Sequence, residues 1–365
     1  MCGMLTSKDI VLQTLAFKET FRSPVMPHWW GLYKFELAGL VNSYEQEHIA
    51  WEMNGSDLAT VDDIFYNKFS PDILHLSAGC SKLHTDPKWG EYLDELCIAI
   101  KKFNSFSIID EFCQHIYCSK EKALDCGKYS HVSIHARNHP DAFLAMNEGN
   151  PVGTALGTGG YIDFEDSYIA LLEHPKEMEY FIQRLYNDLI PQMEALHELG
   201  ADAYIGSETM CSADLISPKL YRDIIFPAQQ QFYKKINDIG LIPMAYFTGN
   251  IMPLLDSIEN LHIRALLIEE DKKGYGIKLG KICKRLHGNI AVFGNIDGIS
   301  VMLKGTPEDV RREVFKQLDE AGSKGFVVSC GSPLAFHTPR ENVHALKNAV
   351  EEYLCLPESM KPFAD

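Results

Sequence analysis

Residues 289–330 read NIAVFGNIDGISVMLKGTPEDVRREVFKQLDEAGSKGFVVSC, with one helical pattern between two apolar runs. It opens with a short apolar run at 289–294 and closes with another, GFVVS, at 325–329. Between the two runs, Thr306 can cap a helix whose first turn holds a proline and two acidic residues, and Gly322 closes the helical pattern. A strand, a helix and a second strand in this order predict a βαβ unit with parallel strands.

The same alternation runs through the second half of the chain and predicts five consecutive βα units. The apolar runs are ADAYIG (201–206), LIPMAYF (241–247), IRALLIE (263–269), NIAVFG (289–294) and GFVVS (325–329). Runs that are apolar on both faces suit parallel strands buried under helices. In the first half we expect strands at PVMPHWW (24–30), DILHLSA (72–78) and PVGTALG (151–157).

Eight strands alternating with helices predict an α/β fold, a single (β/α)8 barrel domain over residues 1–365 with an N-terminal extension. Residues 90–145 fit neither the helical nor the strand period. We expect an insertion there, which could form a lid over the barrel mouth.

The composition of the chain argues against nucleic acid and membranes as partners. The chain carries 34 Lys and Arg against 50 Asp and Glu, a formal charge of -16, and it has no basic stripe that would neutralise nucleic acid. We find no signal peptide and no apolar run long enough for a membrane span, so we expect a cytoplasmic protein. Ten cysteines without regular spacing predict reduced thiols and suggest an anaerobic cell.

Chemistry in such barrels lies where strands end and the following loops begin. The polar residues at these positions are His28 with Trp29 and Trp30, His75, Glu208, Tyr246 with Thr248, Glu269 with Glu270, Asn295 with Asp297, and Ser329 with Cys330.

Three of these residues are candidate catalytic groups. The phenol of Tyr246 could donate a proton or hydrogen bond to a substrate oxygen, or it could pack on the barrel rim. Glu208 could move a proton or bind a cation, and helix capping is its alternative role. Asp297 could contact substrate or brace neighbouring loops.

Substrate binding is expected from His28, Trp29, Trp30, His75 and Asn295. The aromatic group at residues 28–30 could form the floor of a pocket for an aromatic or quaternary-amine substrate, or it could be ordinary core packing.

Three segments resemble the uroporphyrinogen decarboxylase superfamily, which also contains zinc-dependent corrinoid and coenzyme M methyltransferases. They are DLISPKLYRDIIFP, VFGNIDGISVMLKGTPEDV and GFVVSCGSPLAFHTPRENVHALKNAV, in the order that the family has them. The resemblance covers roughly residues 145–354 and implies a (β/α)8 barrel enzyme.

The true decarboxylase branch resembles the chain in its fold signatures but not in its substrate-binding residues. Its N-terminal arginines hold the carboxylates of a porphyrinogen, whereas PVMPHWWGLYKFELAG offers His28, two tryptophans and Lys34. The family's central aspartate is matched by Ala78, and its late Leu-Gly-His pattern is matched by the segment that begins at Cys330. We therefore do not expect porphyrinogen decarboxylation.

The methyltransferase branch resembles the chain at Cys330, where that branch has its late zinc-binding cysteine. Tyr246 and Thr248 stand where its His-x-Cys motif supplies two further ligands, and Glu270 matches a glutamate ligand of the wider group. The resemblance implies zinc held by Glu270 and Cys330, with Glu208, Cys211 or His28 completing the shell.

Two other clusters are expected not to bind metal. His131, His135 and His139 recur every four residues, but their segment is rich in β-branched residues and precedes a proline, which argues against a helix. The cysteines at positions 97, 113, 118 and 126 lack the spacing of a metal motif.

These observations favour a methyltransferase that passes a methyl group from a small O-, N- or S-methylated compound to a corrinoid protein, that is, a demethylase component. The alternatives are a lyase that acts on another small carboxylate and a ligand-binding barrel with eroded chemistry. The expected partners are the small substrate and the corrinoid protein, without nucleic acid or membrane, and the resemblance suggests a homodimer.

Overall fold

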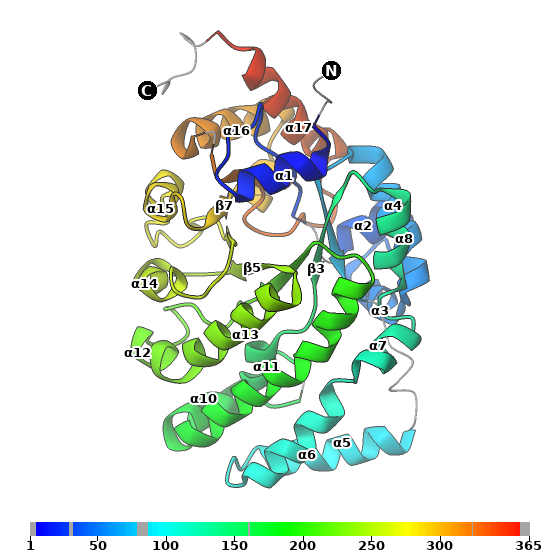
Figure 1. Ribbon diagram of the computed structural model, residues 1–365, viewed down its shortest axis with the longest axis vertical. Coiled ribbons are helices and arrows are strands. Elements are labelled where there is room, and N and C mark those ends of the chain that lie inside the picture. The colour runs from blue at the N-terminus through cyan, green and yellow to red at the C-terminus, as the bar shows by residue number, and fades with distance from the viewer. Residues whose placement is uncertain (1–4, 29–31, 79–86, 160, 323, 358–365) are drawn as a thin grey trace.

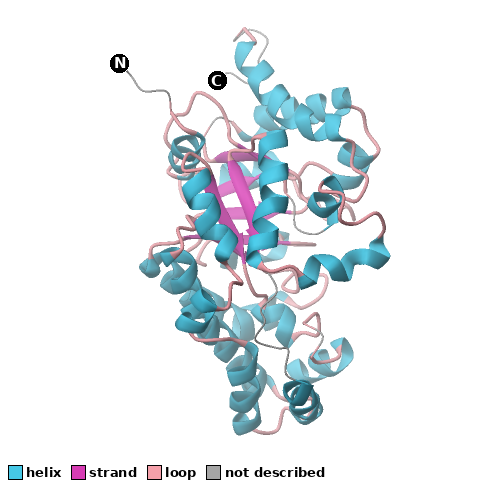
Figure 2. Ribbon diagram, turned by 90° about the vertical axis from the view of Figure 1, so that its right-hand side faces the viewer, coloured by secondary structure: helices cyan, strands magenta, loops and turns pink. Residues whose placement is uncertain are grey.

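The computed structural model describes residues 5–28, 32–78, 87–159, 161–322 and 324–357. Within them, eight parallel strands form one sheet in the order β1-β8-β7-β6-β5-β4-β3-β2. The strands are β1 (Val25–Met26), β2 (Ile73–Ser77), β3 (Phe143–Asn147), β4 (Ala203–Ser207), β5 (Ile242–Phe247), β6 (Ala265–Ile268), β7 (Ala291–Phe293) and β8 (Phe326–Ser329). The sheet curls into a (β/α)8 barrel, and helices surround it (Figures 1 and 2).

Helices connect successive strands and form the outer layer of the barrel (Figure 1). In the first half they are α1 (Ser7–Leu15), α2 (Leu32–Leu37), α3 (Glu47–Glu52), α4 (Gly55–Phe69), α5 (Pro87–Ile100), α6 (Phe106–Ile116), α7 (Lys120–Asp125), α8 (Ser130–Asn138), α9 (Pro151–Ala155), α10 (Phe164–Glu173) and α11 (Pro175–Glu198). In the second half they are α12 (Pro218–Leu220), η3 (Tyr221–Ile225), α13 (Phe226–Ile239), α14 (Leu255–Ile258), α15 (Leu279–Leu286), η5 (Gly298–Leu303), α16 (Pro307–Ala321) and α17 (Arg340–Cys355); short 3₁₀ turns are η1 (Tyr44–Gln46) and η4 (Met252–Leu254).

Asp72 fastens the two strands at which the barrel closes, β1 and β2. Its backbone N–H donates to the carbonyl of Val25 at 3.0 Å, and its carboxylate accepts the N–H of Val25 at 2.8 Å. Arg22 donates to both oxygens of the same carboxylate, at 2.6 and 2.7 Å. Arg22 therefore neutralises the charge of the buried Asp72 carboxylate. The pair lies where the backbone hydrogen-bond ladder between β1 and β2 is incomplete.

Alternate strand residues fill the barrel interior, and the residues between them face the helices. One cluster of buried side chains forms this interior: Val11, Leu15, Met26, Ile73, Phe143, Ala145, Ala203, Ile205, Met244, Tyr246, Ala265, Leu267, Ala291, Phe293 and Val327. Val11 and Leu15 belong to α1, so the N-terminal extension plugs the amino end of the barrel. The carboxyl end remains for a site.

The prediction of a strand at residues 151–157 is wrong. Asn150 caps a helix there, because its side chain accepts the N–H of Gly153 at 2.8 Å and Pro151 fits the first turn of α9. The third strand is β3, eight residues earlier in the chain. Each of the other seven predicted runs contains a strand.

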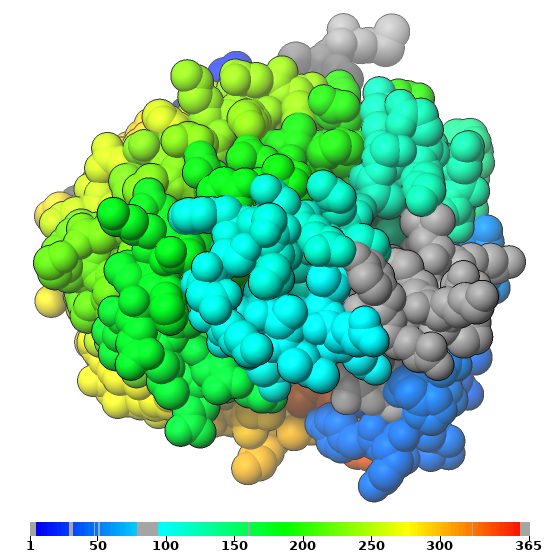
Figure 3. Space-filling model, turned by 90° about the horizontal axis from the view of Figure 1, so that it is seen from below, coloured from blue at the N-terminus to red at the C-terminus, as the bar shows by residue number. Residues whose placement is uncertain are grey.

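Residues 90–145 are mostly helical. One helix suffices between β2 and β3 of a barrel, and the structure has α5, α6 and α7 in addition to α8. The α6 helix packs against α11, and in Figure 3 the cyan atoms of this inserted part cover the centre of one face. The insertion is thus present, and its action as a lid stays a prediction.

Among the described residues, no helix combines the length and the apolar character that a membrane crossing requires.

Candidate active site at the carboxyl end of the barrel

A layer of polar side chains follows the last apolar layer of the barrel interior. His28 comes two residues after Met26 of the interior, and His75 comes two residues after Ile73. The ring of His28 lies 5.4 Å from that of His75 and 4.7 Å from that of Tyr246, measured between centroids. These three side chains, from three different strands or strand ends, thus lie close together at the carboxyl end of the barrel.

Sequence reasoning missed two members of the layer, Asn147 and Ser207. They end β3 and β4 on the inward-facing register, and the side-chain amide of Asn147 donates to the hydroxyl of Ser207 at 2.9 Å. Asn147 was missed because the third strand was predicted at residues 151–157 rather than at β3. Ser207 was missed because Glu208, the next residue, was the predicted candidate at the end of β4. We call His28, His75, Asn147, Ser207 and Tyr246 the polar layer.

The titratable side chains of the polar layer are held uncharged near neutral pH. Burial lowers the pKa of His28 to about 4, against a smaller opposing effect of the Cys330 backbone. Burial, with repulsion from His28 and Lys34, lowers the pKa of His75 well below its usual value. Burial and the neighbouring glutamates raise the pKa of Tyr246 well above 10. The polar layer therefore offers hydrogen bonds without a positive charge of its own.

An acidic cluster lies beside the polar layer, at the end of β6. Lys272 pairs with Glu269 at 3.1 Å and with Glu270 at 3.0 Å, and it donates to Ser332. Ser332 also donates to Glu270, whose side chain is buried. Burial raises the pKa of Glu270, although hydrogen bonds from its own backbone, Lys272 and Ser332 oppose the shift. Glu270 therefore holds a proton more readily than a free glutamate does, which suits a group that gives a proton to a substrate.

The loop after β8 joins the acidic cluster to the polar layer. The hydroxyl of Tyr246 donates to the carbonyl of Gly331 at 2.9 Å, and Ser332 contacts Glu270. Cys330 is buried against the backbone of His28, and burial raises the pKa of its thiol to about 12. The structure thus brings Tyr246 and Glu270 to the same loop, whereas Cys330 lies with Val328 in the apolar core between the barrel and its helices, with its thiol in the neutral form.

Two clefts of about 290 Å³ each give solvent access to Glu270. The first also has Asp214, Thr248 and Lys272 in its wall. The second has Asp297 in its wall, together with residues of α15 and α16. A buried carboxyl group at the meeting point of two clefts can exchange protons with water.

Glu208 is not brought to this mouth. Its carboxylate accepts hydrogen bonds from Tyr186 of α11 and from Gln229 and Tyr233 of α13, so it lies between strand β4 and the outer helices. Cys211 lies beside it, with 3.9 Å between its sulfur and a carboxylate oxygen. Ser207 takes the inward register, and the residue after it faces outward. Glu208 and Cys211 are therefore placed to organise helix packing.

Asn295 and Asp297 make bracing contacts. The carboxylate of Asp297 accepts the N–H groups of Ile299 at 2.8 Å and Ser300 at 2.7 Å and so caps η5. The amide of Asn295 donates weakly to the carbonyl of Glu269 at 3.4 Å. Trp29 and Trp30 lie outside the described residues.

The residues at the mouth do not fit a zinc ion. Tyr246 and Thr248 stand where the resemblance implies a histidine and a cysteine, and both hydroxyls donate to backbone carbonyls, that of Thr248 at 3.0 Å. Lys272 already supplies the positive charge beside Glu270. Among the described residues, Glu270 and Cys330 belong to no group of three metal-ligating side chains. The zinc shell implied by the resemblance is therefore not assembled here.

An eight-stranded parallel barrel that collects polar side chains at its carboxyl end defines a (β/α)8 protein of the kind that builds binding and catalytic sites there. The chain belongs to the uroporphyrinogen decarboxylase (URO-D) family, whose model matches residues 153–353. That span holds Tyr246, Glu270 and Cys330, whereas His28 and His75 lie before it.

Curated relatives include enzymes of two activities. The methylcobamide:CoM methyltransferase MtaA of Methanosarcina barkeri is 28% identical over 167 residues, 45% of each chain. The methylated-thiol–coenzyme M methyltransferase of Methanosarcina mazei is 25% identical over 183 residues, 49% of this chain and 45% of that one. The uroporphyrinogen decarboxylase of Pseudoalteromonas translucida is 26% identical over 188 residues, 49% of each chain. The matches thus span about half the length of these relatives.

The fold extends beyond the part matched by sequence. A solved structure described as a methyltransferase from Methanosarcina mazei superposes with a TM-score of 0.71 and 17% identity, over 96% of this chain and 99% of that one. The whole barrel, including its first half, therefore has a counterpart among known structures.

Proposed function

We propose that this protein is a methyltransferase that moves a methyl group from a small O-, N- or S-methylated compound to a corrinoid carried by a partner protein. The observation that carries the proposal is the mouth itself, where an uncharged polar layer adjoins Glu270, a buried carboxyl group with a raised pKa. Similarity to methyltransferases of the URO-D family supports the same reading.

In the proposed reaction an acid, Glu270, activates the leaving heteroatom in place of a metal cation. When the carbon–heteroatom bond breaks, its electron pair stays on the heteroatom, which takes a proton from Glu270. The methyl carbon accepts an electron pair from the reduced corrinoid, the second substrate. Lys272, 3.0 Å from Glu270, stabilises the carboxylate that remains, and solvent in the clefts returns the proton.

The polar layer would hold and orient the methyl donor. Tyr246 keeps its proton because of its raised pKa, and the neutral rings of His28 and His75 can each donate or accept a hydrogen bond. Such a surface favours neutral or cationic small molecules. The nearby cation Lys34 is bound to Asp62 at 2.8 Å, so it does not serve as a clamp for the carboxylates of a porphyrinogen.

The experiment is methyl transfer to cob(I)alamin from a panel of methyl ethers, methylamines and methyl thioethers, followed by the absorbance change on formation of methylcobalamin. The reverse reaction, from methylcobalamin to thiols, is assayed in parallel. We expect protein-dependent transfer with at least one compound class. The absence of methyl transfer with every compound, in both directions, would refute the proposal. Release of carbon dioxide from a small carboxylate would establish the lyase alternative instead.

A further inference from the structure

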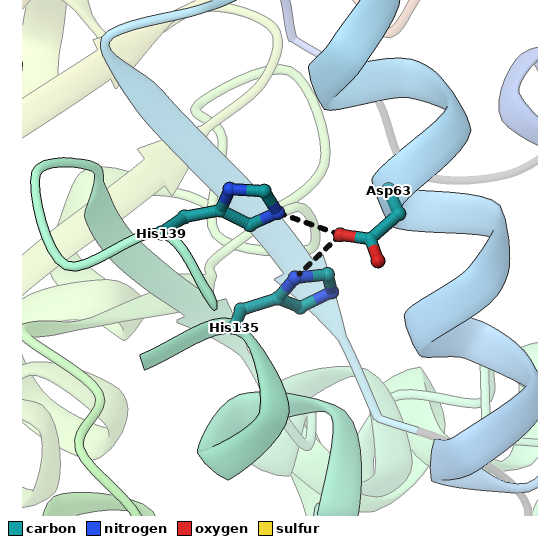
Figure 4. A group of neighbouring side chains, drawn as sticks. All are labelled: Asp63, His135 and His139. Carbon is teal, nitrogen blue, oxygen red and sulfur yellow. Dashed lines mark hydrogen bonds and ion pairs between the residues drawn. The ribbon is translucent and has the colours of Figure 1, made fainter. Parts of the chain in front are cut away.

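Three metal-ligating side chains converge on the outside of the barrel, in the part of the chain that precedes the family match. Asp63 lies on α4, and His135 and His139 lie on and directly after α8 (Figure 4). One carboxylate oxygen of Asp63 is 2.7 Å from Nε2 of His139 and 3.3 Å from Nδ1 of His135. All three donor atoms lie within 4.8 Å of one another.

The local structure that creates this cluster is a helix where none was expected. Residues 130–138 form α8 in spite of their β-branched residues and the proline that follows, because the helix is held by packing against α4. On a helix, residues four apart share one face, so His135 and His139 both point at Asp63. Their rings are stacked, with centroids 5.6 Å apart.

A second carboxylate stands behind the cluster. Nε2 of His135 faces Oδ2 of Asp62 at 3.7 Å, and the other oxygen of Asp62 accepts a hydrogen bond from Lys34 at 2.8 Å. Asp62, Lys34 and His135 are all buried. Histidines that bind metals usually turn their second ring nitrogen towards such a carboxylate, which fixes the ring and makes the ligating nitrogen more basic.

We propose that Asp63, His135 and His139 bind a divalent transition-metal ion, with Zn²⁺ the best fit, and that Asp62 orients His135 from behind. Two imidazoles and one carboxylate form a ligand set suited to Zn²⁺, which leaves a fourth, tetrahedral position for water. Zinc bonds of about 2.0–2.1 Å would place the ligand atoms roughly 3.3 Å apart, whereas the Asp63 oxygen now lies 2.7 and 3.3 Å from the two imidazole nitrogens.

The exposure of the cluster allows the ion to enter. The side chain of His135 is fully buried, whereas those of Asp63 and His139 are 33% and 14% exposed. The open coordination position therefore faces solvent. A bound ion would tie the helix that precedes β2 to the helix that precedes β3.

The test is titration of metal-stripped protein with Zn²⁺ against a chromogenic chelator, for the wild type and for Asp63→Asn and His139→Ala, two changes at partly exposed positions. Circular dichroism checks that the variants are folded. Glu36→Gln is the matched control, because Glu36 pairs with His337 at 2.6 Å and the pair belongs to no group of three ligands among the described residues. We expect one tightly bound ion per chain in the wild type and the control, and binding at least about tenfold weaker in both cluster variants.

Co²⁺ reports which residues hold the ion. Co²⁺ bound by nitrogen and oxygen ligands absorbs in the visible range and lacks the near-ultraviolet charge-transfer band of a thiolate ligand. The spectrum therefore shows whether the cluster or a cysteine holds the ion. Binding of equal affinity in wild type, Asp63→Asn and His139→Ala, or a thiolate band in the wild type at one equivalent, overturns the proposal. Neither result depends on methyl transfer.

Discussion

Replacement of Glu208 by glutamine is expected to cost stability and to spare the chemistry. The carboxylate accepts hydrogen bonds from Tyr186, Gln229 and Tyr233, all buried. A glutamine keeps one carbonyl acceptor and adds an N–H₂ donor among three groups that already donate. An unsatisfied buried donor costs about 1–3 kcal/mol, so the free energy of unfolding should fall by that amount.

The pH dependence of this loss has a definite sign. Burial raises the pKa of Glu208 in the folded protein above its ordinary 4.5, so the folded state binds the proton more tightly than the unfolded state. This contribution to stability is fully present below pH 4.5 and is lost as pH rises through the folded-state pKa. Glu208→Gln has no such proton and should lack this dependence.

Urea unfolding between pH 4 and pH 8, together with methyl transfer at 25 °C, measures both effects. Glu352→Gln is the control, because Glu352 is an exposed partner of Arg311 and exposed ion pairs contribute little to stability. The methyl-transfer rate of Glu208→Gln should stay within about threefold of the wild type, less than the effect of losing a general acid. A drop of 100-fold or more with unchanged unfolding would refute the separation of Glu208 from the active site.

Three further outcomes are expected. Lys272→Met removes the ammonium that lowers the pKa of Glu270. The pH at which the methyl-transfer rate falls on the alkaline side should therefore rise, and an unchanged pH–rate profile would mean that Glu270 is not the acid. Gly331→Ala places a Cβ 2.4 Å from a Glu270 oxygen and 2.5 Å from its backbone nitrogen, so stability should fall by about 1–3 kcal/mol in urea unfolding, and a neutral effect would show that the loop position is wrong. Asp72→Asn leaves the buried charge of Arg22 uncompensated and should lower the free energy of unfolding by about 3–5 kcal/mol; a loss below 1 kcal/mol would contradict the role given to this pair in closing the barrel.

The second half of the barrel could be predicted from sequence because its strands are short, apolar on both faces and separated by well-capped helices. The first half could not, since tertiary packing decides its elements. Asn150 and Pro151 turn an apparent strand into α9, and packing on α4 makes a helix of residues 130–138. The β-branched residues of that helix suggested the opposite.

The site was predicted in part for the same physical reason. Tyr246 and Glu270 belong to strand ends that were correctly located, and the loop after β8 contacts both. Cys330 also follows such a strand, but it lies in the apolar core between the barrel and its helices. Glu208 also follows a correctly located strand, but a shift of one residue in register turns a side chain from the mouth to the helices. A single sequence locates strand ends to within a residue or two, which is too coarse to decide between those faces.

We propose that Glu270, beside the uncharged polar layer, supplies the proton for methyl transfer. The most direct test is the single-turnover rate of methyl transfer to cob(I)alamin by Glu270→Gln, at saturating methyl donor and with folding checked. We expect a rate about 10²–10⁴-fold below that of the wild type, with substrate binding retained. A glutamine variant that turns over at the wild-type rate would contradict it.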